Sequence, residues 1–157
     1  IRDQVLLSLF MSLSYLLATL HLLILAIGIA AVYARWRALR DVRTVAHLPA
    51  VFLADNWYGV AAMGWVITGL WRAFGGLEKG SEFYLESHWF IGKMGLFALV
   101  FLLELLPMIT LVRWRIDRRK GRPLALNRAP LLARLTLAQI PLLVLMVGMA
   151  TAMARGL

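Results

Sequence analysis

Three side chains that can take up or release a proton lie inside apolar stretches of the sequence: His21, Asp55 and Glu104. A charge at the centre of a lipid bilayer costs about 2.5–3.5 kcal/mol on insertion scales, so such groups are kept neutral or are paired. Together, a histidine and two carboxylates could carry protons or ions through a membrane. Separately, each could serve as a hydrogen-bonding group between helices.

The depth of these residues follows from counting along each helix from its basic end, at about 1.5 Å per residue. Glu104 then lies roughly 13 Å deep, Asp55 roughly 9 Å and His21 roughly 21 Å. We therefore predict a buried polar cluster of Asp55, Glu104 and His21. Glu104 is expected to face the first or second helix, either protonated or paired with a cation. Asp55 has an alternative interpretation as the N-cap of its helix, because it stands just before an apolar run.

A second group of polar residues is expected at the opposite membrane boundary. Its cationic members, Arg72 and Lys93, are predicted at equal depth, about 30 Å from the basic ends of their helices. We predict that these cations form an outer polar cluster with groups of the connecting segment, the full set being Arg72, Glu82, Tyr84, Glu86, His88 and Lys93. Alternatively, Arg72 and Lys93 extend into the lipid headgroups, as long cationic side chains near a boundary do.

His21 is the candidate ligand for a cofactor. A histidine in the middle of a membrane can ligate haem iron, but a pair of axial histidines needs a second one at similar depth. The other two histidines, His47 and His88, are predicted near the two membrane boundaries. Haem held by His21 alone, or with a different second ligand, is the remaining cofactor hypothesis.

Other chemistry finds no support in the sequence. Cysteine is absent, which excludes disulfides and thiolate metal sites. The sequence also has no phosphate-binding loop, nucleophile elbow, dinucleotide fingerprint or metal-ligand spacing. We assign no catalytic residue and no metal site, and the sequence favours a protein that is not an enzyme.

Four apolar segments must position these residues. The chain has 157 residues, of which 62% are hydrophobic and 16% charged, whereas a soluble domain has about 25% charged residues. A membrane-spanning helix needs about 20 mostly apolar residues. The segments that meet this criterion are about 5–34, 50–74, 89–112 and 135–154. We predict an all-α integral membrane protein, a bundle of four transmembrane helices forming a single membrane domain over residues 1–157.

The charges orient this bundle. The net charge of +9 would suggest nucleic acid in a soluble protein, but here the basic residues gather between apolar segments. Residues 35–49 and 113–134 are predicted to be basic cytoplasmic loops, and residues 75–88 an acidic outer loop. Both termini are then on the outer, periplasmic side of a bacterial inner membrane. The expected partners are the lipid bilayer, with anionic lipids at the basic loops, and no nucleic acid.

The central part of the sequence resembles an uncharacterised bacterial membrane-protein family known as domain of unknown function 2214. The matching positions are Asp55, Gly59, Ala61, Ala62, Gly69, Arg72, Lys79, Gly80, Tyr84 and Lys93. This resemblance implies a four-helix inner-membrane protein and supplies no activity. A weaker likeness, through His21, His88 and Lys93, is to the HemJ-type protoporphyrinogen oxidases, and it implies haem or porphyrin chemistry.

Three functions follow as hypotheses. The first is a non-catalytic accessory or assembly subunit of a larger membrane complex, in contact with other membrane subunits. The second is a haem- or porphyrin-linked membrane oxidoreductase centred on His21. The third is a small transporter or proton path that uses Asp55, Glu104 and His21.

Overall fold

The computed structural model describes residues 2–75 and 86–155. Four long helices make up most of this part of the chain: α1 (Arg2–Arg40), α2 (Leu48–Phe74), α4 (His88–Arg119) and α5 (Ala129–Arg155). All four are long and apolar enough to cross a membrane. The prediction of an all-α fold with four candidate spans is confirmed, and the described residues contain no strand.

Local sequence signals mark where the helices begin and end. A short 3-10 helix, Val45–His47, leads into α2, and Pro49 occupies its first turn, where a missing N–H costs nothing. The Ser87 hydroxyl accepts a hydrogen bond from the Phe90 N–H and so caps the start of α4. After α4 the chain turns at Gly121, whose φ of 64° favours glycine.

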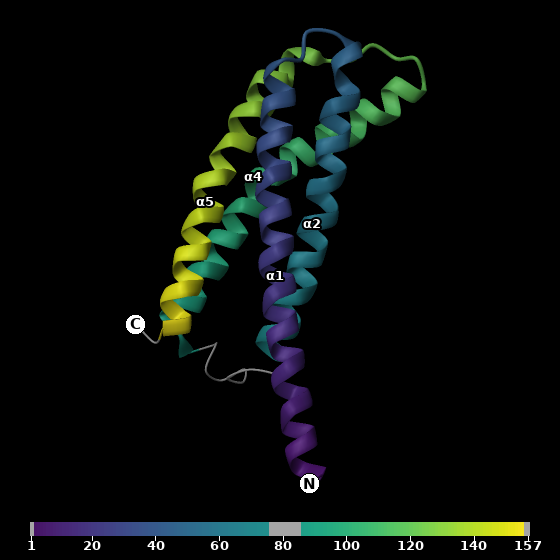
Figure 1. Ribbon diagram of the computed structural model, residues 1–157. Helices are drawn as coiled ribbons and strands as arrows, with labels where there is room; N and C mark the ends of the chain where they lie inside the picture. Colours follow the sequence, from purple (N-terminus) through teal and green to yellow (C-terminus); the bar gives the residue numbers. More distant parts are fainter. Residues whose placement is uncertain (1, 76–85, 156–157) are drawn as a thin grey trace.

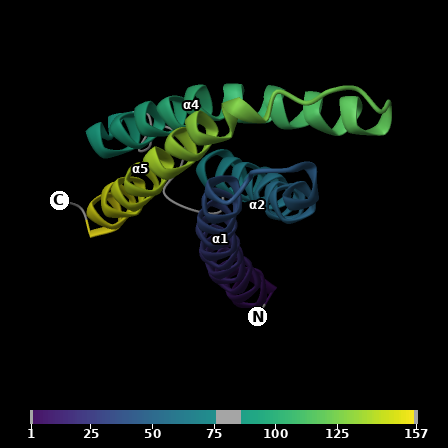
Figure 2. The same cartoon turned by 90° about the horizontal axis from the view of Figure 1, so that it is seen from above.

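The helices pack unevenly. Extensive packing joins α1 to α2, α1 to α5, and α4 to α5. Figure 1 shows α4 tilted and crossing behind α1, and Figure 2 shows it running along one side of the bundle. The α1–α2 and α4–α5 connections lie at one end, here called the basic end, while α1 begins and α5 ends at the opposite, terminal end (Figure 1).

The buried core has two parts along the bundle. One part lies near the basic end and is built around Leu39, Leu48, Leu111, Trp114 and Leu132. The other lies further along the helices and consists of Val32, Val100, Leu143 and Met146. Many large apolar side chains point outwards on all four helices. Lipid is as apolar as these side chains, so such a surface suits a bilayer.

The helices extend further at the basic end than the sequence predicted. Helix α1 continues to Arg40, α4 continues to Arg119, and α5 begins at Ala129, so the connections are shorter than residues 35–49 and 113–134. Arginine is a good helix former, and two of the arginines involved pair with partly buried carboxylates of other helices. The capping interpretation of Asp55 is wrong, because α2 begins at Leu48, about two turns earlier.

Candidate functional site

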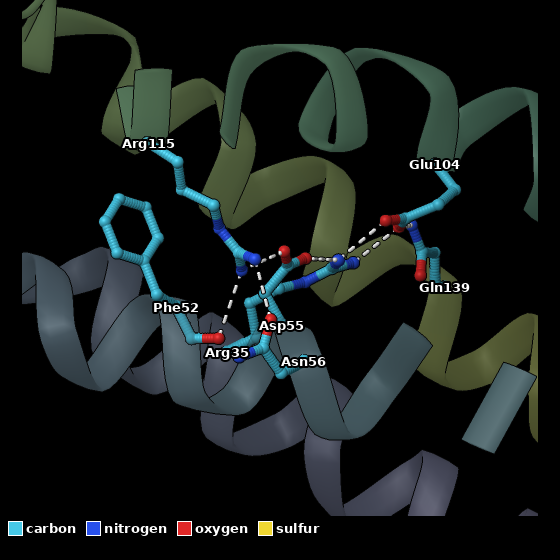
Figure 3. A network of polar contacts seen from close by, with 7 residues as sticks. All are labelled: Arg35, Phe52, Asp55, Asn56, Glu104, Arg115 and Gln139. Carbon is cyan, nitrogen blue, oxygen red and sulfur yellow. Dashed lines mark hydrogen bonds and ion pairs between the residues drawn. The ribbon is translucent and has the colours of Figure 1, made fainter. Parts of the chain in front are cut away.

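Arg35, on α1, is a fully buried cation. Its side chain is 0% exposed and donates to carboxylates of two other helices (Figure 3). Nη1 donates to Asp55 Oδ1 at 2.9 Å and to Glu104 Oε1 at 2.6 Å, while Nη2 donates to Glu104 Oε2 at 2.5 Å. The two parallel bonds to Glu104 form the bidentate geometry that makes guanidinium–carboxylate pairs strong and directional.

A second arginine, Arg115 on α4, reaches the same aspartate. Its Nη2 donates to Asp55 Oδ2 at 2.7 Å and to the Phe52 carbonyl at 3.1 Å, and its Nη1 donates to Asn56 Oδ1 at 2.7 Å (Figure 3). The Arg115 guanidinium also lies 4.9 Å from the centre of the Phe52 ring. Asp55 therefore bridges two guanidinium groups, one from α1 and one from α4.

Helix α5 completes the set through Gln139. This residue is buried, and its Nε2 donates to Glu104 Oε2 at 2.8 Å. Tyr58 packs beneath the Arg35 guanidinium, with its ring centre 4.5 Å away. We call the polar group the Arg35 network, and its members are Arg35, Asp55, Asn56, Glu104, Arg115 and Gln139. All four helices contribute to it, and its two arginines balance its two carboxylates.

The charge balance explains how these groups can be buried. Asp55 and Glu104 are only 16% and 14% exposed, so each has lost most of its hydration. Removing one partner of such a buried pair typically costs about 3–5 kcal/mol, because it leaves an uncompensated charge. The network therefore commits the four helices to one arrangement near the basic end.

His21 lies elsewhere, on the part of α1 nearer the terminal end. Its Nδ1 is 2.8 Å from Thr68 Oγ1, and that hydroxyl donates to the Gly64 carbonyl at 2.8 Å. The imidazole and the hydroxyl therefore share one hydrogen bond, whose direction is set by the tautomer of His21. A Cβ at Gly69 would lie 3.2 Å from His21 Cε1, so the imidazole sits where α2 has no side chain.

His21 also lines a cavity of about 330 Å³ between the helices. Arg72 and Lys93 line it too, so the structure brings these two cations of the predicted outer polar cluster to one place. Glu86 and His88 are exposed where α4 begins. Glu82 and Tyr84 lie outside the described residues.

The structure separates His21 from the other two members of the predicted buried polar cluster. Asp55 and Glu104 come together, but the residue that joins them is Arg35, which lies about 21 Å along α1 from His21. The sequence predicts Arg35 in the basic loop 35–49, whereas the structure places it within α1. A proton path through Asp55, Glu104 and His21 as one unit does not match this geometry, and we do not propose it.

Sequence reasoning missed four residues of the network, although two of them left a signal. Arg35 follows His21 at twice the seven-residue interval that returns to the same helix face. Arg115 follows Glu104 at the same eleven-residue spacing, about three turns, that relates Glu104 to Lys93. Asn56 and Gln139 carry no charge and gave no such signal.

Comparison with known proteins places the chain in a family. No curated protein and no solved structure matches it. The family model described as "Predicted membrane protein (DUF2214)" matches residues 13–157, which include all of the Arg35 network and His21. The chain therefore belongs to this family of predicted membrane proteins, domain of unknown function 2214.

Proposed function

We propose that this protein is a non-catalytic accessory or assembly subunit of a larger complex in the bacterial inner membrane. The observation that supports this function is the composition of the Arg35 network. Its arginines and carboxylates bond to one another and to amides, across all four helices. Groups used in this way hold helices together and present no reactive atom to a substrate.

The outer surface of the helices is suited to lateral contacts in the membrane. The connections at the basic end are short, so at that end the surface available to a partner is mainly that of the helices. Gly59, Gly95 and Gly148 lie on three different helices with open space beside them. Small residues on a membrane helix let a second helix approach closely, and thus favour helix association.

Co-purification from native membranes tests this function. The full chain carries a C-terminal affinity tag, is expressed at its native level, and is extracted with a mild detergent. We expect a second integral membrane protein to elute with it in a fixed ratio. A Gly59→Leu variant should lose that partner, whereas Leu53→Ile, also on the exposed side of α2, should keep it. Elution of the tagged chain alone under these conditions would contradict the proposal.

A haem- or porphyrin-linked oxidoreductase is the second candidate, and one feature of His21 favours it. The hydrogen bond between Nδ1 and Thr68 orients the imidazole through one ring nitrogen, as the non-ligating nitrogen of ligand histidines usually does. Met146 lines the same cavity and offers the thioether found with histidine in some haem sites. The visible spectrum of the purified protein decides: haem gives a Soret band that His21→Ala removes, and a protein without haem gives none.

A further inference from the structure

We propose that three arginines on the outer faces of the helices, Arg37, Arg113 and Arg134, each bind the headgroup of an anionic phospholipid at the basic end. We call them the lipid-facing arginines. This interaction surface goes beyond the proposed subunit function and does not depend on it. It also makes the lipid contact expected for the basic loops more specific, because these residues lie on α1, α4 and α5 and not in the connections.

The lipid-facing arginines lie at one level of the bundle. Each is exposed, and each is next in sequence to a residue of the core near the basic end. Trp114 and Ala133 are buried members of that core, and Trp36 packs against it. The three cations therefore lie at similar depth on three different helices, where headgroups of one leaflet can reach all of them.

On α4, an exposed apolar row leads to the cation. Leu102, Leu106 and Ile109 are exposed, and Arg113 follows them at steps of three and four residues. Residues at these steps share one face of a helix. Arg113 is the member of this row nearest the basic end. Its long side chain can therefore reach the headgroups while the row below it faces the acyl chains.

The same arrangement is found on α1 and α5. Exposed apolar residues share a helix face with each cation, and they are Leu23, Ala30 and Tyr33 for Arg37, and Ala138, Pro141 and Leu145 for Arg134. Helix α1 ends at the basic end and α5 begins there, so the row precedes the arginine on α1 and follows it on α5 (Figure 1). On each helix the row thus lies further from the basic end than the cation does. A phospholipid has the same order, with its headgroup at the boundary and its chains inside.

The charge at the basic end favours an anionic headgroup over a zwitterionic one. Residues 35–48 and 113–134 are all described, and their acidic members are Asp41 and Asp117. Asp117 Oδ1 lies 3.7 Å from Arg122 Nη1. The lipid-facing arginines form no ion pair with a carboxylate of the described chain. A zwitterionic lipid would add a cation of its own to this surface, whereas an anionic lipid compensates the positive charge.

The position of the cations favours a lipid over an acidic protein in solution. The positive-inside rule accounts for the presence of basic residues at this end, but it does not require them to end an exposed apolar row. Arg118 is exposed without such a row, because Trp114 and Leu111, one and two turns before it on its helix face, are buried. An acidic protein would meet cations of this kind, and the apolar rows would contribute nothing to its binding.

Native mass spectrometry of the full chain tests the proposal. The purified chain, in a mild detergent, is mixed with equal amounts of phosphatidylglycerol and phosphatidylcholine that carry the same acyl chains. We expect the chain to bind phosphatidylglycerol in preference, up to one molecule for each lipid-facing arginine. Glycerol 3-phosphate, which has the phosphate but no acyl chain, should not displace the bound lipid. Equal binding of the two lipids, or displacement by glycerol 3-phosphate, would overturn the proposal.

Two triple variants that lose the same charge separate position from charge. The first replaces all three lipid-facing arginines by glutamine. It should weaken the binding of phosphatidylglycerol at each site about fivefold, the contribution of one cation close to an anionic membrane surface. The second combines Arg43→Gln, Arg118→Gln and Arg128→Gln, which are exposed at the same end, and should leave binding unchanged. Equal weakening in both variants would assign the binding to overall charge and contradict the proposal, as would tighter binding of soluble polyglutamate than of phosphatidylglycerol.

Discussion

The two halves of the bundle differ in the surroundings of their ionisable residues. In the half near the basic end, Arg35 and Arg115 are bonded directly to Asp55 and Glu104, and a cluster of buried apolar side chains packs in the same half. In the half near the terminal end, His21, Arg72 and Lys93 surround a hollow. In the first region the arginines are matched by carboxylates of the same network, and in the second the imidazole of His21 meets Thr68 beside a space between the helices. The first arrangement holds the helices together, and the second leaves space between them.

The largest effect is expected from removing the central cation of the network. Arg35→Leu would leave Glu104 without its guanidinium partner and Asp55 with Arg115 alone. We expect a loss of about 3–5 kcal/mol in the free energy of unfolding, measured in mixed detergent and SDS micelles. Arg37→Leu, an exposed position on the same helix, should change that free energy by less than about 0.5 kcal/mol.

Replacing the acceptor should have a smaller effect. Glu104→Gln keeps the shape of the side chain but removes the charge that meets Arg35. A hydrogen bond to a charged group contributes about 1.5–3 kcal/mol, so we expect a loss of unfolding free energy in that range. A change below about 0.5 kcal/mol would indicate a neutral Glu104 that serves only as a hydrogen-bonding group, and would weaken the contrast between the two halves.

In the other half, a single methyl group should have a smaller effect again. A Cβ at Gly69 would lie 3.2 Å from His21 Cε1, so Gly69→Ala must displace the imidazole. We expect a destabilisation of about 1 kcal/mol, at the lower end of the cost of overpacking. Gly59→Ala is the matched control, because nothing lies within 4 Å of its added Cβ. It should be neutral or slightly stabilising, since alanine is the better helix former.

The orientation of the bundle in the membrane can be tested without a change in stability, because it concerns which half faces which side. The positive-inside rule predicts the basic end in the cytoplasm and both termini outside. Cysteine introduced at Ser81 should react with an impermeant thiol reagent in spheroplasts, while cysteine at Gly121 should react only after the membrane is opened. The chain has no native cysteine, so the background is zero. Labelling of Gly121→Cys in sealed spheroplasts would reverse the proposed orientation.

The sequence predicted the helices better than the site, for identifiable reasons. Four apolar segments of membrane-spanning length predict four helices. In lipid, every backbone N–H and C=O must find a hydrogen-bond partner within the protein, and a helix provides these partners within one segment. The burial of Arg35 was not predicted, because an arginine beside an apolar run ordinarily marks a loop. Its partners lie on helices that are distant in sequence. Spacing within one helix shows which residues share a helix face. Which faces of two helices meet depends on the packing between helices, and spacing does not give this.

His21 illustrates the same limit from the other side. Its predicted depth suggests a place near Asp55 and Glu104. Depth alone does not say which neighbouring helix a side chain on α1 faces. In the structure Thr68 is hydrogen-bonded to its ring, and Gly69 leaves room for the ring because it has no side chain. A glycine facing a histidine on another helix becomes informative only when the register of the two helices is known.

A double-mutant cycle between Arg35 and Glu104 tests the central claim that the charged members of the network stabilise one another. The unfolding free energies of Arg35→Leu, Glu104→Leu and the double variant are compared with that of the parent chain. In the double variant Asp55 still has Arg115, so no buried charge is left alone. We predict a coupling of roughly 2 kcal/mol, so that the double variant loses about 2 kcal/mol less than the sum of the two single losses. Additive losses, with a coupling below about 0.5 kcal/mol, would contradict the account.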